Sequence, residues 1–135
     1  MKMNGAVHIQ KSESIQEIPE KSVHYIPCKI HVDGSAKVSQ YFLSSTNKDG
    51  ELEASFRGHP LKGKVVELPK GYKGLILEET IKRSEDQERT LHVTKTFTEL
   101  TYWNWDKVPT KNDVFLAAMD WIDIADALHS PVDEV

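Results

Sequence analysis

The sequence predicts a mainly β domain that ends in one α-helix. Short apolar runs typical of strands recur between glycine- and proline-containing turns over residues 7–109. A helical repeat of apolar side chains then covers residues 113–129. The length of 135 residues suits a single domain, residues 1–135, and a hydrophobic content of 39% leaves room for a partner to complete its core.

The first half of the chain is interpreted as strands that lead into a polar loop. Residues 7–9 alternate apolar and polar side chains, whereas residues 13–19 fit a short helical turn or a covering loop. Residues 23–32 alternate again and end at a turn, which indicates a second strand. The apolar run 38–43 is typical of the next strand, which leaves through the polar loop 44–50.

The second half contains the most frequent turn signals. Residues 53–74 read E-A-S-F-R-G-H-P-L-K-G-K-V-V-E-L-P-K-G-Y-K-G, so that turns interrupt apolar faces every few residues. Residues 75–77 form another apolar run, and the polar segment 82–90 is predicted to be a flexible charged connection. Residues 91–103 supply the last strands, with threonines among larger side chains. About five to seven short strands at this spacing predict a barrel or a sandwich.

The final segment predicts a helix with two apolar stripes. Asn112 or Asp113 can cap its start, and Pro131 can end it. One stripe contains Val114, Ala117, Ala118, Trp121, Ala125 and Leu128, and the other contains Phe115, Met119 and Ile122. We expect one stripe to pack on the domain itself, with Trp121 on the inward side, and the other to contact a different chain of an assembly.

The sequence contains no constellation typical of catalysis or metal binding. Asp120, Asp123 and Asp126 come nearest, but the first and third lie some 120° apart around the helix, which favours a solvated or partner-facing acidic face. The histidines show no ligand spacing, and Cys28 is interpreted as a small buried hydrophobe. The glycines occur at turns without a phosphate-binding pattern. No catalytic, cofactor-binding or metal-binding residue is therefore predicted.

Charge and cysteine content restrict the partners and the compartment. The 17 basic and 21 acidic residues give a net charge of −4, so no overall field draws the chain onto nucleic acid. The single cysteine favours a reducing compartment, and no apolar run approaches the roughly 20 residues that cross a bilayer.

A local basic surplus lies within residues 53–74. It consists of Arg57, Lys62, Lys64, Lys70 and Lys73. Solvated turns explain it most simply, and contact with a phosphate backbone would require these turns to share one edge. We expect Arg57 to clamp a carboxylate or carbonyl group within or between subunits.

Several separated motifs resemble one known family. Residues 55–58 read S-F-R-G, Leu61 and a K-G pair follow, and residues 68–74 read L-P-K-G-Y-K-G. The P-C-K-I-H-V-D-G segment at residues 27–34 resembles the first hairpin of that family, and the segment 121–129 falls in its order. Over nearly its whole length the chain is similar to the non-catalytic C subunit of eukaryotic type-2 ribonuclease H.

That resemblance implies a fold and a structural role. Strands of this chain would interleave with the B subunit in a shared triple-barrel fold, with Phe42, Phe56 and Leu68 in the shared core. The pair would dock on the catalytic A subunit, which would hold the divalent metal, so that this chain binds no cofactor. The assembly would be an obligate hetero-oligomer without membrane contact. The predicted interface residues are Arg57, Phe115, Met119, Trp121 and Ile122.

The same resemblance implies the activity of the complex. It would cleave the RNA of RNA–DNA hybrids and remove single ribonucleotides from DNA in the nucleus. Excision of ribonucleotides would support genome stability, and the non-catalytic role of this chain would be to hold the B and A subunits together and to keep A active.

Two alternatives belong to other classes of protein. A stand-alone small β-barrel nucleic-acid-binding module would use Trp103, Trp105 and the basic turns, and it predicts a stable monomer with salt-dependent hybrid binding. Neutral to acidic neighbours favour a packing role for both tryptophans instead. A stand-alone nuclease would depend on the helix aspartates and would require metal-dependent cleavage.

Overall fold

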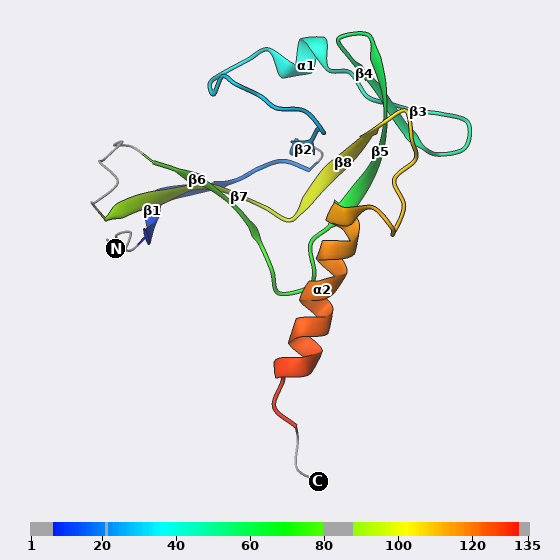
Figure 1. The fold of residues 1–135 in the computed structure, drawn as a ribbon. Coiled ribbons are helices and arrows are strands. Elements are labelled where there is room, and N and C mark those ends of the chain that lie inside the picture. The colour runs from blue at the N-terminus through cyan, green and yellow to red at the C-terminus, as the bar shows by residue number, and fades with distance from the viewer. Residues whose placement is uncertain (1–6, 21, 80–87, 133–135) are drawn as a thin grey trace, which may run out of the picture.

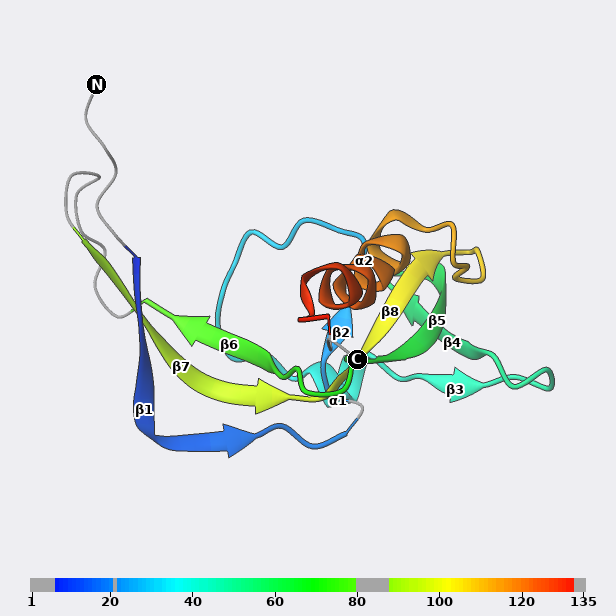
Figure 2. The ribbon, with the colours of Figure 1, turned by 90° about the horizontal axis from the view of Figure 1, so that it is seen from below.

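Two β-sheets and one long C-terminal helix make up the chain, as Figures 1 and 2 show. The computed structural model describes residues 7–20, 22–79 and 88–132. This architecture confirms a mainly β chain with a C-terminal helix. The helices are α1 (Val38–Tyr41) and α2 (Val114–His129). The strands are β1 (Val7–Glu17), β2 (His24–Tyr25), β3 (Ser45–Thr46), β4 (Leu52–Phe56), β5 (His59–Glu67), β6 (Gly74–Glu78), β7 (Arg89–Phe97) and β8 (Glu99–Trp105).

The three-stranded sheet has the order β1-β7-β6 and lies to one side of the molecule (Figure 1). β1 runs parallel to β7, with Ile9 opposite Leu91, and β6 runs antiparallel to β7. Both outer strands carry exposed apolar side chains, including Ile9 on β1 and Leu75 on β6. This sheet therefore lacks the covering layer that a small sheet needs to be stable.

The five-stranded sheet has the order β2-β8-β5-β4-β3. β4 and β5 form a hairpin closed by Arg57 and Gly58, whose φ angles are 50° and 79°. Two residues at positive φ form the turn that matches the twist of paired strands. β5 then pairs antiparallel with β8, and Gly63 lies opposite Trp103.

A bend in the chain joins the two sheets. Only Thr98 separates β7 from β8, and Figure 2 shows the two strands following one another across the molecule. At the bend, the Leu68 amide donates a hydrogen bond to the Thr98 carbonyl oxygen at 3.0 Å. Within the described residues neither sheet closes on itself, because β1, β6, β2 and β3 remain at open edges. The predicted interleaving of strands with a partner stays a prediction.

Three local predictions in the first half are wrong. Residues 38–43 form no strand: Val38–Tyr41 is the short helix α1. The strand predicted at 23–32 shrinks to β2, and residues 29–37 are exposed and unpaired by any described strand. The segment 13–19 is no helical turn, because β1 continues through Glu17 alongside β7. Alternation of apolar side chains forms a strand only where a neighbouring strand pairs with the backbone.

The charged connection predicted at residues 82–90 lies mostly outside the described residues. Its end is strand, since Arg89 begins β7. Arg89 pairs with Glu79, with its Nε and a terminal nitrogen at 3.0 and 2.8 Å from the two carboxylate oxygens. This carboxylate, first by its hydrogen bonds and then by its charge, raises the pKa of Arg89.

The hydrophobic core is small, and the surface is large for the mass of the chain. Among the described residues, the buried hydrophobic side chains are Leu61, Val93, Leu100, Tyr102, Trp103 and Leu116. The chain exposes 11503 Å² to solvent. A compact monomer of 15.4 kDa exposes about 7,200 Å². The excess of about 4,300 Å² is several times what one partner buries in a standard interface.

Candidate partner-binding surfaces

Trp103 is the central side chain on one face of the five-stranded sheet. It is fully buried, with 0% of its surface exposed. A Cβ atom at position 63 would lie 2.6 Å from the indole ring, so the ring covers Gly63 directly. The indole Nε1–H donates a hydrogen bond to Nδ1 of His24 at 3.0 Å. The predicted packing role of Trp103 is confirmed.

His24 and Phe42 cover the indole from the N-terminal half of the chain. Phe42 meets Trp103 edge-on, with ring centroids 5.4 Å apart, and its centroid lies 5.1 Å from that of His24. Burial lowers the pKa of His24 below 6.5, which favours the neutral imidazole that accepts the indole hydrogen bond. Phe42 is only half-buried in this chain, so its predicted place in a shared core stays a prediction.

A hollow of about 390 Å³ opens beside Trp103 on this face. Most of its lining is apolar and includes Leu52, Val65, Val108 and Pro109. An open apolar hollow of this kind accepts the side chains of a partner more readily than it organises a reaction. This face of the sheet is therefore the first candidate partner-binding surface.

The opposite face of the sheet carries an aromatic stack that holds α2. Phe115 stacks on Tyr102 with ring centroids 5.2 Å apart and on Tyr25 with centroids 4.6 Å apart. Leu116 packs beside them against Leu100. Burial, followed by the charge of Asp113 and by Tyr25, raises the pKa of the Tyr102 phenol, which keeps it neutral. Helix α2 is thus attached through its first turns.

Asp113 ties the start of α2 to β8. Its Oδ2 atom accepts hydrogen bonds from the Asn104 side-chain amide and, at 3.3 Å, from the Thr110 backbone amide. The Ala117 amide donates to the Asp113 carbonyl oxygen at 2.8 Å, as in the first helical turn. Asp113 therefore precedes the helix as predicted, but its carboxylate bonds the preceding loop and strand instead of capping the helix.

The predicted inward position of Trp121 is wrong for the isolated chain. Trp121 is 66% exposed, Val114 87% and Leu128 74%, and Ala118 and Ala125 are exposed with them. We call these five residues the outer seam. The stripe that contains Phe115 packs on the sheet instead, because Phe115 stacks on Tyr25 and Tyr102. An interface role for Trp121 remains a prediction.

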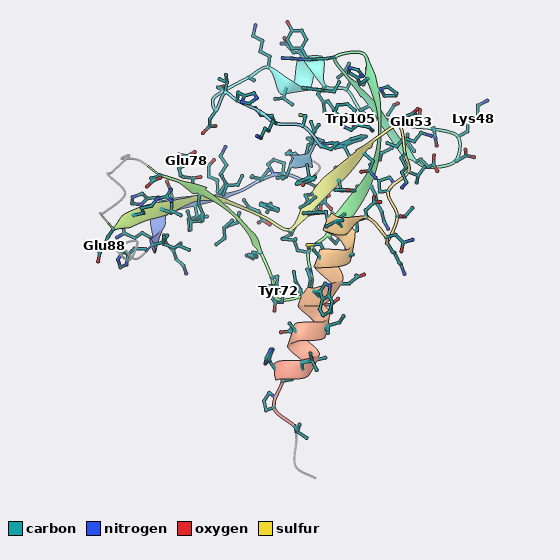
Figure 3. All side chains as sticks on the ribbon, viewed as in Figure 1. Lys48, Glu53, Tyr72, Glu78, Glu88 and Trp105 are labelled. Atoms are coloured by element: carbon teal, nitrogen blue, oxygen red, sulfur yellow. The ribbon has the colours of Figure 1, made fainter. Side chains whose placement is uncertain are left out.

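The rest of the second stripe continues along the inner side of α2. Met119 and Ile122 are half-buried, and Met119 lines a hollow between α2 and β5. Farther along, the Tyr72 hydroxyl donates to an Asp126 carboxylate oxygen at 3.1 Å, and Figure 3 shows Tyr72 beside the helix. This hydrogen bond and the charge of Asp126 raise the pKa of Tyr72. Contacts of Met119 and Ile122 with a partner remain a prediction.

Arg57 lies in the hairpin turn and is exposed. Its guanidinium carbon lies 5.7 Å from the ring centroid of Phe56, and no carboxylate within the described residues pairs with it. The predicted clamp therefore does not form within the described chain, and a contact with a partner remains a prediction. Phe56 and Leu68, predicted for the shared core, are half-buried.

The candidates for nucleic-acid binding do not gather on one edge. Arg57 and Lys70 lie beyond opposite ends of β5, whose nine residues span about 30 Å. The helix carboxylates Asp120, Asp123 and Asp126 are exposed. Among the described residues no group of three His, Cys, Asp or Glu side chains could hold a metal ion. In the same part of the chain, no helix has the length and apolar character required to cross a membrane.

The contacts that sequence analysis missed join distant parts of the chain. The His24–Trp103 hydrogen bond and the stack of Tyr25 on Tyr102 both connect β2 to β8. β2 has two residues, so no periodicity could reveal it. The sequence does show the alternation of side chains along β8, which places Trp103 and Tyr102 on opposite faces of the sheet.

Comparison with known proteins identifies the family of the chain. The chain matches the family described as Ribonuclease H2 non-catalytic subunit (Ylr154p-like) over residues 22–91 and 78–128. It is 26% identical to the C subunit of ribonuclease H2 from Bos taurus over 95% of this chain and 92% of that protein. The values for the C subunit of ribonuclease H2 from Mus musculus are the same. An uncharacterized protein of Schizosaccharomyces pombe is also 26% identical, over 91% of this chain and 92% of its own length.

The matched segments include the elements that build both faces of the five-stranded sheet. They contain β2, the β4–β5 hairpin, β8 and nearly all of α2. The chain therefore belongs to the family of non-catalytic C subunits of ribonuclease H2.

Proposed function

We propose that this chain is the scaffolding subunit of a heterotrimeric ribonuclease H2 complex, in which it interleaves its strands with the B subunit and supports the catalytic A subunit. The observation that carries the proposal is the exposed surface of 11503 Å², against about 7,200 Å² for a compact monomer of this mass. The open edges of β1, β6, β2 and β3 present unpaired backbone groups. Strands of the B subunit at these edges would complete their hydrogen bonding and cover the apolar side chains.

In this proposal the complex cleaves the RNA of RNA–DNA hybrids and excises single ribonucleotides embedded in DNA. The divalent metal that this chemistry requires belongs to the A subunit, and this chain contributes no cofactor ligand. With a net charge of −4 and scattered basic side chains, the chain meets the hybrid through the complex. It acts in the nucleus, where it arrives together with its partners.

Coexpression with the B and A subunits from the same organism tests this function. We expect low soluble yield of the chain alone and a one-to-one-to-one particle on coexpression, measured by size exclusion with light scattering. The particle should cleave a duplex containing one ribonucleotide, and omission of this chain should abolish that cleavage. A stable monomer that ignores both partners would overturn the proposal and would favour the nucleic-acid-binding module.

A pair of substitutions on β1 tests the proposed role of the open edge. Ile9 is 59% exposed, and its neighbour Gln10 is also exposed but on the opposite face. Ile9→Lys should reduce the yield of the complex with the B subunit, because it places a charge on an apolar face that a partner covers. Gln10→Lys is the matched control. Equal yields would exclude this face from the interface.

A further inference from the structure

A single serine of the chain precedes a proline. Of the six prolines, only Pro131 follows a serine or threonine, and the acidic residues Asp133 and Glu134 come shortly after it. Ser130 is exposed and its backbone is extended, with φ −66° and ψ 139°, as expected for a residue before proline. Pro131 is exposed too, and it has no backbone N–H. An accessible, extended serine followed by proline is the feature that proline-directed protein kinases select.

The same serine holds the last turn of α2 together. Its backbone amide donates a hydrogen bond to the Asp126 carbonyl oxygen at 2.9 Å, and its hydroxyl donates a second one to the same oxygen. Every residue from Asp123 to Val132 is exposed, including Leu128 at the end of the outer seam. Exposed hydrogen bonds with few apolar contacts open at a low cost in free energy. The last turn can therefore fray and present Ser130 within an extended segment, as a kinase requires.

We propose that Ser130 is a phosphorylation site for a proline-directed protein kinase, and that the phosphate unwinds the last turn of α2. In this transfer the Ser130 hydroxyl oxygen forms a bond to the γ-phosphorus of ATP. The bond between that phosphorus and the oxygen that bridges to the β-phosphate breaks, so ADP leaves, and the hydroxyl proton passes to a base of the kinase. Neither step depends on the proposed scaffolding function.

The phosphate replaces a hydrogen bond with a repulsion. A serine phosphate carries about 1.5 to 2 negative charges at pH 7, and its ester oxygen has no proton to donate to the Asp126 carbonyl oxygen. It lies at the C-terminal end of α2, where the helix dipole disfavours anions. Asp123 and Asp126 add like charge, and residues 112–132 contain no Lys or Arg to compensate it. His129 is the one basic side chain in the last turn. A phosphate at this position therefore destabilises that turn.

Unwinding of the last turn also releases α2 from the turn between β5 and β6. The Tyr72 hydroxyl donates to an Asp126 carboxylate oxygen at 3.1 Å, and Tyr72 lies beside the helix in Figure 3. Asp126 begins the last helical turn, so it keeps this position only while that turn is formed. Lys70 and Lys73 flank Tyr72 in the sequence. Capture of the phosphate by these lysines is the competing outcome, in which the helix stays intact.

Incubation of the full chain with ATP and a purified proline-directed kinase tests the site. We expect a single phosphate on the chain by intact mass spectrometry, and its loss in Ser130→Ala and in Pro131→Ala. Ser35→Ala is the matched control, because Ser35 is also exposed but is followed by alanine. Equal incorporation in Ser130→Ala and the wild type would overturn the site. The chain alone and the particle coexpressed with the B and A subunits should give the same result, so failure of the particle to form would refute only the scaffolding function.

Far-UV circular dichroism measures the unwinding. Phosphorylation should remove about a quarter of the helical signal of α2, since one turn contains about 3.6 of its 16 residues. It should also shift the tyrosine ring resonance that Tyr72→Phe identifies. Ser130→Ala loses only the hydroxyl hydrogen bond, so it should change both signals much less. Full retention of the helical signal in the phosphorylated chain would overturn the unwinding. A retained signal that falls in Lys70→Ala or Lys73→Ala would overturn it in favour of capture by the lysines.

Discussion

The contact between Gly63 and Trp103 allows a sharp test of the packing. In Gly63→Ala the new Cβ atom would lie 2.6, 2.7 and 2.9 Å from three atoms of the indole ring. The ring cannot move away, because it is fully buried, hydrogen-bonded to His24 and flanked by Phe42. Overpacking of this kind costs about 1–3 kcal/mol. Alanine is favoured over glycine in a strand by about 0.5–1 kcal/mol, so the net loss lies between roughly 0 and 2.5 kcal/mol, and the middle of the two ranges gives about 1 kcal/mol.

Urea unfolding of the coexpressed complex, followed by far-UV circular dichroism, measures this loss as a lower midpoint. The control is the same substitution in a Trp103→Leu background, which removes the ring atoms nearest to position 63. There the steric cost disappears, and Gly63→Ala should be neutral or stabilising. The reasoning is refuted if Gly63→Ala has the same effect in both backgrounds, because the cost would then not arise from the indole.

Three further outcomes follow from named contacts. His24 has its pKa lowered by burial, so its contribution to stability is present above about pH 6.5 and is lost as the pH falls through the lowered pKa. His24→Asn keeps an acceptor for the Trp103 hydrogen bond but has no group that titrates. Between about pH 7.5 and 5 the thermal midpoint of this variant should therefore fall less than that of the wild type. An equal fall in the two thermal midpoints would contradict this prediction. Arg57→Asn should raise the free energy of unfolding by up to about 1 kcal/mol, because Asn tolerates the positive φ of this position better than Arg does. A free energy of unfolding below that of the wild type would argue against strain in the turn. Phe115→Ala should lower the free energy of unfolding in urea by about 3 kcal/mol. Trp121→Ala should change the stability of the chain by less than about 0.5 kcal/mol but should weaken assembly. A larger loss of chain stability for Trp121→Ala than for Phe115→Ala would place Trp121 inside the chain.

The sequence was sufficient to predict the elements whose stability is local. The β4–β5 hairpin follows from apolar runs on either side of Arg57-Gly58, and α2 follows from its helical repeat and the proline beyond it. Both patterns reflect backbone geometry within a few residues. The sequence could not rank the two stripes of α2, since both are apolar. The choice depends on Tyr25 and Tyr102, which come from distant strands and stack on Phe115.

The failed predictions share a physical cause. Ile30 and Val32 alternate with polar residues as in a strand, but they are 73% and 81% exposed, and Trp121 was placed inward although it is largely exposed. Each prediction assumed that the same chain covers its own apolar side chains. That assumption holds for a monomer with a complete core. It fails where a partner completes the sheets, as the proposed scaffolding function requires, because the pattern then reflects burial in the assembly. Contacts with partner chains should therefore be sought first at apolar side chains that the sequence pattern predicts to be buried and that the isolated chain exposes.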